Sequence, residues 1–575
     1  MKEGIVELTE DVSASPLYSE DLAPVPKEKR TWNKWSLAAL WVGMAVCIPT
    51  YLLASYMMAD GMGWLESLII IGVANIIITI PMVLNGHAGV KYGVPFPVVG
   101  RSSFGVNGIH LASITRAIVA CGWFGIQTWI GGMALYEIFY AFSDNPTPTD
   151  LNLLMFVCFG AFWFLNMFFI WKGTNSIKWL EEYSAPILIL MGVVLIGWGA
   201  YNGGGFSNVL KQSEQLQNPV FSKIDNLDNS ITIHPIVDAK GYPKANLYQS
   251  QIISISDTTV SPWKELSKNG IIPLPDNYNK ADQLSFRLRS DKKEKKHLSS
   301  WVNVDLKAPK KEAPNKGWQY LKWLTVMLGF WATMSLSIAD ITRYAPTQKS
   351  QKQGQFIGLP GTMMLYSFVA IFVTCAALIN FDDVLIAGDA PWDPTTLLGK
   401  FESPWVVVVA QFFMIIATLS TNIAANVIAP SNAFSNLFPK KISFKKGGTI
   451  TGIIGILICP WWLMSYIAPL MLFIGGLLGA VLAIMLCDYF VIRKKELKLV
   501  DLYKRDGIYS YGKTGFNKAA IIALCLGVIA ALVWEMIPSL AYLNNLAWFS
   551  GFFVSFTAYY ILMKNSNHYK NLNNN

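Results

Sequence analysis

The sequence predicts an all-α integral membrane protein with about twelve transmembrane helices, and three observations support this fold class. Hydrophobic residues make up 53% of the 575 residues, and charged residues only 14%. Soluble globular proteins carry about 25% charged residues, so this chain lacks the side chains that usually cover a water-facing surface. Apolar runs long enough to cross a bilayer recur along the chain, interrupted by one long polar segment.

Runs of about 20 apolar residues locate the predicted spans. They lie near residues 36–58, 64–84, 112–141, 151–171, 184–202, 320–340, 356–380, 404–429, 449–467, 469–492, 519–537 and 544–563. Residues 1–30 are polar, and no apolar signal-peptide core precedes span 1, so we expect the N-terminus in the cytoplasm. An even number of spans returns the C-terminus to the same side. Lysine and arginine gather in the loops on that side, as the positive-inside rule requires.

The polar segment between spans 5 and 6, residues 203–317, is expected on the opposite side of the membrane. Short alternating stretches such as 231–236 and 250–256 favour β-strands. A loop of this length is usually functional or disordered, so a small β-rich module and a disordered linker are the two alternatives, and we favour the module. The sequence does not indicate a partner for this insertion.

Composition also bears on the class of function. The formal net charge of +9 fits basic cytoplasmic loops better than nucleic-acid binding. The seven cysteines lie in apolar stretches without metal-ligand spacing, and the five histidines are scattered, so no cofactor and no catalytic pair are expected. A membrane-embedded enzyme is therefore a weaker alternative. A channel is another, but its polar groups would follow several spans, whereas here they gather at one depth.

Span 3 carries the first candidate site residues. Trp123 and Gln127 are four residues apart and share a helix face, which presents an indole plane and an amide to the same volume. A flat heterocycle with N–H and C=O groups would fit this pair. The alternative is that the tryptophan packs and the glutamine bonds a neighbouring helix.

Spans 1 and 6 carry signs of interrupted helices. In span 1, Pro49 removes a backbone donor and Gly43 loosens the preceding turn, so either a simple kink or a break with free carbonyls near Gly43 and Val46 is expected. In span 6, polar residues follow Trp331 towards Arg343, which favours a second interruption.

Span 8 has five polar side chains within ten residues, which is costly in a membrane unless they face a site. Ser420 and Thr421 place two hydroxyl oxygens beside the carbonyl of Ala417, hard ligands of the kind that bind an alkali cation. Asn426 is six residues beyond Ser420 and can meet a substrate amide. The alternative for either hydroxyl is a bond back to its own helix.

Together these residues resemble the nucleobase–cation symporter-1 family, whose members take up purines, pyrimidines, hydantoins and related compounds with Na⁺ or H⁺. The resemblance rests on residues 123–129, 330–331 and 420–426, on Phe104-Gly105 after Arg101, and on 487–495 followed by Asp501-Leu-Tyr. It implies the 5+5 inverted repeat of the leucine-transporter type, with two further C-terminal helices.

The resemblance also implies roles for individual residues. Trp123 and Trp331 match two indoles that sandwich a substrate ring, and Gln127 and Asn426 match the amides that bond it. The cation positions are the backbone carbonyls of Gly43, Val46 and Ala417 and the hydroxyls of Ser420 and Thr421. Two positions depart from the characterised bacterial hydantoin carrier: Cys47 replaces a glutamine, and Gly43 replaces an alanine at the cation site.

The expected organisation combines these observations. It comprises a cytoplasmic tail (1–34), a first repeat (35–202), the insertion (203–317), a second repeat (318–492), a cytoplasmic loop (493–518), two further helices (519–564) and a cytoplasmic tail (565–575). We expect a multi-pass importer in the cell membrane that moves a neutral planar heterocycle such as uracil, allantoin or a hydantoin by alternating access, coupled to Na⁺ or H⁺. The departure at Cys47 leaves open which heterocycle it is.

Overall fold

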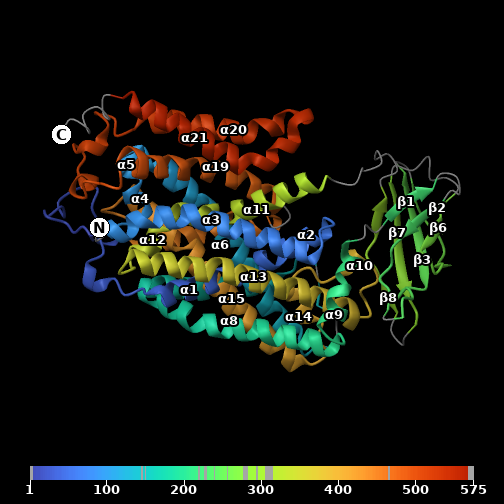
Figure 1. Ribbon diagram of the computed structural model, residues 1–575. Coiled ribbons are helices and arrows are strands. Elements are labelled where there is room, and N and C mark those ends of the chain that lie inside the picture. The colour runs from blue at the N-terminus through green and yellow to red at the C-terminus, as the bar shows by residue number, and fades with distance from the viewer. Residues whose placement is uncertain are drawn as a thin grey trace.

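The computed structural model of the chain shows a bundle of helices, with a β-sheet module at one end and both chain termini at the other (Figure 1). It describes residues 4–143, 147–148, 150–217, 221–225, 230–238, 240–254, 257–275, 283–292, 296–304, 315–463 and 467–566. Several predicted features fall partly outside these residues: the two tails (at 1–3 and from 567 on), parts of the insertion 203–317 including the end of the stretch 250–256, and the end of span 9 at 464–466.

The helices follow the order of the predicted spans. The first half contains α1 (Lys34–Ala45), α2 (Ile48–Ala59), α3 (Trp64–Tyr92), α4 (Phe96–Val99), α5 (Arg101–Phe104), α6 (Ile109–Tyr140), α7 (Leu153–Lys172) and α8 (Thr174–Asn202). The second half contains α11 (Lys316–Ser337), α12 (Ala339–Thr342), α13 (Gln348–Asn380), α14 (Pro394–Gly399), α15 (Pro404–Asn426), α16 (Ile428–Leu437), α17 (Phe444–Leu457), α18 (Pro460–Leu463) and α19 (Ile467–Leu486), with a π-helical turn at Cys487–Ile492. Helices α20 (Lys518–Leu532) and α21 (Ala547–Lys564) follow.

Within the described residues, nine helices are long and apolar enough to cross a membrane, and the bent pair α1 and α2 raises the number to ten. Helices α11 and α17 lie at the two remaining predicted spans. Span 5 begins earlier than predicted: α8 starts at Thr174, ten residues before the expected start at 184. The apolar run misplaced this boundary because the first turns of α8 carry charged residues, of which Glu181 is buried by the fold and Glu182 is exposed.

Span 1 is a broken helix, as one of the two alternatives predicted. Helices α1 and α2 meet at 59°, and Val46 and Cys47 separate them in non-helical conformations. Pro49 lies in the first turn of α2, where its missing N–H costs no helical bond. The interruption of span 6 is smaller, because only Ile338 separates α11 from α12 and its backbone angles are helical.

The contacts between helices repeat in the two halves. In the first half α1 packs against α8, and in the second half α11 packs in the same way against α19. Across the halves, α1 packs against α13 and α11 against α3. These matched pairs are the 5+5 arrangement, with the broken first helix of each half at its centre.

Close helix packing explains some of the glycines. A Cβ on Gly329 of α11 would lie 2.4 Å from the carbonyl oxygen of Met471 in α19. Gly475 of α19 meets the Cα of Gly329, which a Cβ would approach to 3.0 Å. Helices α11 and α19 therefore touch backbone to backbone, which side chains at these positions would prevent.

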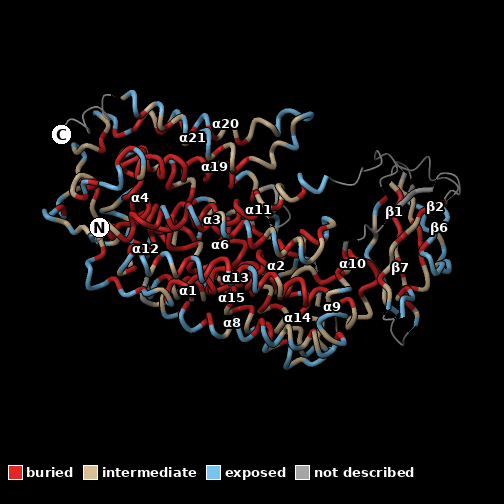
Figure 2. The backbone as a smooth tube through the Cα atoms, in the orientation of Figure 1, coloured by how far each residue is buried: buried red, intermediate tan, exposed pale blue. Residues whose placement is uncertain are grey.

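The outer surface of the bundle exposes apolar side chains. Figure 2 shows buried backbone through the middle of the bundle and exposed segments at its edges. On α3, large apolar side chains spaced along one face are 39–52% exposed: Leu65, Ile69, Val73, Ile76, Ile80 and Leu84. Water would oppose such a stripe, and lipid tails accept it.

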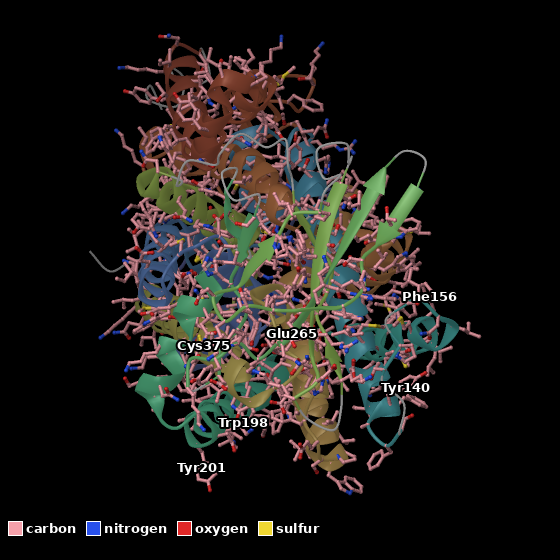
Figure 3. All side chains as sticks on the ribbon, turned by 90° about the vertical axis from the view of Figure 1, so that its right-hand side faces the viewer. Tyr140, Phe156, Trp198, Tyr201, Glu265 and Cys375 are labelled. Atoms are coloured by element: carbon pink, nitrogen blue, oxygen red, sulfur yellow. The ribbon has the colours of Figure 1, made fainter. Side chains whose placement is uncertain are left out.

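Aromatic side chains gather at one end of the helical bundle. Figure 3 looks onto the end that carries the β-sheets, with Tyr140 at the last turn of α6 and Trp198 and Tyr201 at the last turn of α8. Tyr201 is 87% exposed and points away from the bundle. Tyrosine and tryptophan at helix ends are typical of the boundary between lipid and water.

The insertion contains a β-rich module, as favoured from its alternating stretches. One antiparallel sheet has the order β1 (Phe221–Asp225), β2 (Ser230–Ile233) and β6 (Ile271–Pro273). The second is built on β3 (Leu247–Ser254) and β7 (Gln283–Ser290), paired from Leu247 with Arg289 to Ile253 with Gln283. β4 (Asp257–Val260), β5 (Lys264–Glu265), β8 (His297–Leu298) and β9 (Val302–Val304) complete it, and α9 (Phe206–Lys211) and α10 (Ser213–Gln217) connect it to α8.

The core of the β-module includes two residues from the loop that joins α13 to α14. Leu385 and Ile386, between α13 and α14, are buried together with Phe286 and Leu288 of β7. The Ile236 N–H donates to the Leu385 carbonyl at 2.8 Å. The module is therefore attached to the loop after span 7.

The segment before α1 also packs against the bundle, which its polar composition did not predict. Its residues bridge several elements at the end opposite the β-module: the Val25 N–H donates to the Gly93 carbonyl at 2.8 Å, and Leu22 is fully buried. Arg101 of α5 donates to the carbonyl of Leu17 and to the side chain of Asn436. The first described residues thus form part of the fold at this end.

Candidate functional site

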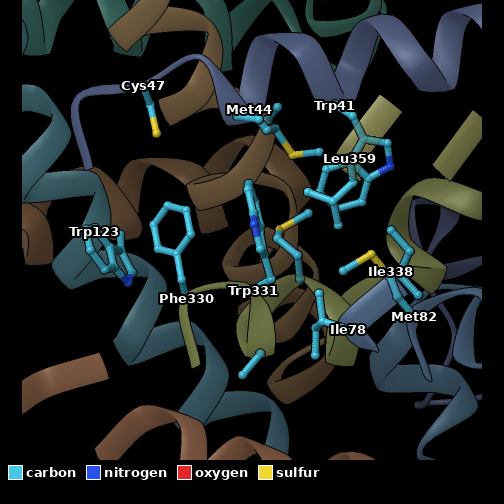
Figure 4. Close-up of a cluster of buried hydrophobic side chains, with 14 of the residues drawn as sticks. Trp41, Met44, Cys47, Ile78, Met82, Trp123, Phe330, Trp331, Ile338 and Leu359 are labelled. Atoms are coloured by element: carbon cyan, nitrogen blue, oxygen red, sulfur yellow. The ribbon is translucent and has the colours of Figure 1, made fainter. Parts of the chain in front are cut away.

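The predicted substrate residues come from three helices, and the two tryptophans among them lie near Cys47 at the break in span 1 (Figure 4). Trp123 and Gln127 are on α6, Trp331 on α11 and Asn426 at the end of α15. These four side chains are between 2% and 7% exposed. Because they are buried, a substrate could reach them only after the surrounding helices move.

Phe330 lies between the two indoles, which the sequence did not indicate. Its ring is 6.1 Å from Trp123 in an edge arrangement and 4.8 Å from Trp331, measured between ring centroids. Figure 4 shows this order, with Trp41 beyond Trp331. In this conformation the indoles therefore do not face each other directly, and a ring stacked between them would require Phe330 to move.

Cys47 lies beside these aromatic rings, at the gap between α1 and α2 (Figure 4). It is 1% exposed, and its Sγ is 3.3 Å from the Thr50 hydroxyl. The departure from the hydantoin carrier thus lies where the sequence placed it, at the helix break near Trp123.

Two buried polar atoms near the rings have no hydrogen-bond partner among the described residues. One is the Gln127 Oε1, an acceptor, and the other is the Trp331 Nε1, a donor. Buried polar atoms in native proteins are nearly always bonded, so each such exception needs an explanation. A ligand with both N–H and C=O groups would supply one.

Asn426 is oriented by a network that the sequence analysis missed. Its Nδ2 donates to Asn422 Oδ1 at 3.1 Å, and Asn422 in turn donates to Thr128 Oγ1 and Asn166 Oδ1, both at 3.1 Å. Asn422 thereby ties α15 to α6 and α7. Its four-residue spacing from Asn426 was visible in the sequence, but its partners lie far apart along the chain.

A buried arginine on α6 connects this helix to α11 and α15. Arg116 Nε donates to the Thr333 carbonyl at 2.8 Å and Nη2 to the Ala425 carbonyl at 3.2 Å. It lies on α6, seven residues before Trp123, and is 1% exposed. The sequence analysis did not single out this residue.

The predicted cation residues lie on α1 and α15, which pack against each other and against α8. The Thr421 Oγ1 donates to the Gly43 carbonyl at 2.8 Å, which ties α15 to the last turn of α1. Ser420 is fully buried beside it, Ala417 is 1% exposed, and Val46 lies in the helix break. The hydroxyls therefore bond across helices, which answers the alternative that they only bond back to their own helix.

A carboxyl group that was not predicted joins this cluster. The Ser420 Oγ donates to Glu181 Oε2 at 2.7 Å, and the Ser184 Oγ is 3.1 Å from the Ser420 Oγ. Glu181 is 1% exposed, on the part of α8 that lies before the predicted start of span 5. The sequence placed this glutamate in a loop, so it was not considered.

Metal-ligating side chains of the classic kind do not cluster in the described part of the chain. Within it, no group of three or more His, Cys, Asp or Glu residues could hold a metal ion. The oxygen positions around Ser420 are of a different type, since they are carbonyls and hydroxyls with one carboxyl group. Such hard oxygen donors suit an alkali cation.

Motifs that are far apart in the sequence meet at the end of the bundle that carries the chain termini. Asp488 and Arg493 form a buried ion pair, with 2.9 Å between Nε and Oδ2. The hydroxyls of Ser102 and Ser103 also donate to Asp488 Oδ2, at 3.0 and 3.2 Å. The stretches 101–105 and 487–495, which carried part of the family resemblance, are therefore one structural unit outside the substrate region.

Comparison with known proteins gives consistent matches over the whole chain. The family described as permease for cytosine/purines, uracil, thiamine, allantoin matches residues 24–227 and 299–551. The allantoin permease of Bacillus subtilis is 31% identical over 558 residues, which cover 95% of this chain and 93% of that protein. The purine-uracil permease NCS1 of Arabidopsis thaliana is 30% identical over 568 residues, which cover 95% of this chain and 78% of that protein.

A solved structure shares the fold. Mhp1, described as a nucleobase-cation-symport-1 family transporter in a closed conformation with bromovinylhydantoin bound, superposes with a TM-score of 0.67. The sequences are 19% identical, and the match covers 96% of this chain and 98% of that chain. At this identity the match shows the fold, which is the predicted 5+5 arrangement with two further helices.

Proposed function

Since the chain belongs to the family of permeases for cytosine and purines, uracil, thiamine and allantoin, we propose that it imports a planar heterocycle of the nucleobase, allantoin or hydantoin class together with a cation. Members of this family are transporters, so the chain is a membrane carrier and not an enzyme. The sequence alternatives of a channel and a membrane enzyme are set aside on this basis.

The observation that carries the substrate class is the pair of unsatisfied polar atoms beside the aromatic rings. Gln127 Oε1 can accept a hydrogen bond and Trp331 Nε1 can donate one, and both are buried. Trp123 offers an apolar ring face within the same region. A flat heterocycle with N–H and C=O groups on its edge would satisfy both atoms and stack on an indole.

The coupling cation is proposed to bind at the oxygen cluster of α1 and α15. The carbonyls of Gly43, Val46 and Ala417 and the hydroxyls of Ser420 and Thr421 would hold it. The fit is supported by the burial of both hydroxyls and by the bond from Thr421 to the Gly43 carbonyl. A cation there would add its charge between one helix of each repeat and stabilise the state in which they meet.

Alternating access follows from the burial of the substrate residues. Because substrate and cation contact the same broken helix, binding of one favours the arrangement that binds the other, and each raises the affinity of the other equally. Gly475 and Gly476 of α19 are proposed to form a flexible gate. The close packing of Gly475 against Gly329 offers a place where α19 could slide or separate.

We also infer that the chain lies in the cell membrane with both termini in the cytoplasm and the β-module outside. The distribution of basic loops supports this orientation. Labelling in intact cells tests it: a cysteine at Lys240 should react with a membrane-impermeant maleimide, and one at Lys513 should not. The reverse pattern would contradict the orientation.

The proposed substrate class is tested by binding and uptake. Purified protein is screened by thermal shift against uracil, adenine, cytosine, allantoin and hydantoin, and the stabilising compound is used for uptake into proteoliposomes with and without an ion gradient. Uptake should saturate and should collapse without the gradient. A flux that does not saturate, or a chemically changed compound inside the vesicles, would refute symport.

Site variants sharpen this test. Trp123→Ala and Gln127→Ala should each weaken substrate binding by about 1–3 kcal/mol, or about 5- to 150-fold. The control is Trp405→Ala, because Trp405 is 69% exposed on the outer face of α15. Affinities within about twofold of the unchanged protein in both site variants would remove the assignment of the site.

A further inference from the structure

Glu181 is a buried carboxyl group that the proposed function does not yet use. Its Oε2 accepts a hydrogen bond from Ser420 at 2.7 Å, and its Oε1 is buried without a hydrogen-bond partner among the described residues. A carboxylate in such surroundings is costly unless a positive charge or further donors accompany it. The atom that lacks a partner therefore indicates that something else is bound there at some stage.

The environment of Glu181 is made of the predicted cation residues. Glu181 lies against Gly43 of α1 and bonds Ser420 of α15. The Gly43 carbonyl in turn accepts a hydrogen bond from Thr421 of α15. Ser184, one turn further along α8, bonds the Ser420 hydroxyl. Glu181 thus reaches the same cluster of hard oxygens from a third helix.

Gly43 fits this arrangement closely. A Cβ added to Gly43 would lie 1.8 Å from Glu181 Oε2 and 2.4 Å from the Ser420 Oγ. The carboxyl group therefore occupies the space that any side chain at position 43 would need. The glycine that marked a departure from the hydantoin carrier has a physical reason, which is the presence of Glu181.

We propose that the Glu181 carboxylate is a further ligand of the coupling cation, an alkali ion held between α1, α8 and α15. This inference rests on the proposed function, since it concerns the cation of the same transport cycle. With carbonyl and hydroxyl ligands alone the site would be neutral and would become positive on binding. With Glu181 it is negative when empty and neutral when the cation is bound, which favours binding in a low-dielectric interior.

A structural role alone is the competing explanation, and it predicts a different response. If Glu181 only accepted the Ser420 hydrogen bond, a glutamine would serve nearly as well, because its carbonyl oxygen accepts the same bond. If Glu181 binds the cation, glutamine keeps the shape but removes the charge. The two explanations therefore differ in the response to Na⁺ and not only in stability.

The test measures Na⁺ binding without substrate. Purified full-length protein is titrated with NaCl against choline chloride at constant ionic strength and constant pH, and the thermal midpoint is recorded. The unchanged protein should be stabilised by Na⁺ in a saturable way. Glu181→Gln should raise the Na⁺ concentration at half effect at least tenfold, whereas the control Glu182→Gln should not change it, since Glu182 is exposed and pairs with Lys178.

A second pair of variants tests the fit of Gly43 against the carboxyl group. Gly43→Ala should weaken Na⁺ binding because its methyl group displaces Glu181. Combining Gly43→Ala with Glu181→Ala should cost less stability than the sum of the two single losses, because the clash with Glu181 is gone and only the contact with the Ser420 Oγ remains. If the two losses of stability simply add, Glu181 does not occupy that space.

Other results would overturn the proposal. A Na⁺ response of Glu181→Gln equal to that of the unchanged protein would refute a ligand role. An unchanged protein that responds equally to Na⁺ and choline would also refute it. A protein that is stabilised only when the pH is lowered, and not by Na⁺, would refute it in the same way. Substrate binding is read separately: if the unchanged protein binds Na⁺ through Glu181 but no heterocycle of the panel, the proposed substrate class fails and the cation ligand stands.

Discussion

Replacing Asp488 by asparagine should unfold the protein far more easily, although this residue is distant from the substrate region. The side chain is fully buried, and its two oxygens accept four hydrogen bonds: from Arg493, Ser102, Ser103 and Tyr559, at 2.8 to 3.2 Å. Asparagine keeps the size but presents an NH₂ group to one set of these donors and removes the negative charge.

The magnitude follows from the charge left behind. Arg493 has a side chain that is 2% exposed, so without Asp488 its cation is buried without a counter-charge. Breaking a buried ion pair by removing one partner costs about 3–5 kcal/mol. At about 1.4 kcal/mol for each factor of ten, this shifts the unfolding equilibrium by about 100- to 4000-fold.

The assay is equilibrium unfolding by SDS in mixed micelles, followed by circular dichroism. The control is Glu10→Gln, which breaks the Glu10–Lys504 pair of the same 2.9 Å length on the surface and should change little. Adding Arg493→Met to Asp488→Asn should recover part of the loss, because no unpaired cation remains. A loss below about 1 kcal/mol in Asp488→Asn alone would refute the reasoning.

Three further outcomes test other parts of the structure. Gly329→Ala should lower the thermal midpoint, because its Cβ would lie 2.4 Å from the Met471 carbonyl, whereas Gly160→Ala on α7, with nothing within 4 Å, should not lower it. Leu385→Ala removes a fully buried side chain from the core shared with the β-module, and limited proteolysis should cut the module faster while the helices stay intact. Thr421→Val deletes the hydroxyl bond to α1 and should cost about 0.5–1.5 kcal/mol in SDS unfolding, while Thr421→Ser, which keeps the hydroxyl, should cost less. Equal losses in the last two variants would contradict a role for that bond.

Much of the fold could be predicted because bilayer thickness constrains sequence directly. A span needs about 20 apolar residues, so each helix of the bundle has its own signal along the chain. Pro49 and Gly43 indicated an interruption of span 1, either a kink or a break, and the structure has the break at Val46 and Cys47. The start of α8 was misplaced because burial inside the bundle permits Glu181 in a helix that lipid alone would not.

The sequence could predict which residues belong to the candidate site, but not how their side chains are arranged. Trp123 and Gln127 share a helix, so their spacing alone places them on one face. The position of Phe330 between the indoles depends on how α11 packs against α6, and no spacing within one helix encodes it. Asn422 was likewise one of several polar residues on span 8 until its partners on α6 and α7 identified its role.

The sequence by itself determined that this is a helical membrane carrier, where its spans lie, and which residue types gather near the middle of the membrane. Local chemistry is enough for this, because hydropathy and helix periodicity are properties of neighbouring residues. Only the tertiary structure decided that Gly43 and Glu181, 138 positions apart, occupy one space. Such a fit exists only when two helices meet, and it places a carboxyl group at the proposed cation site.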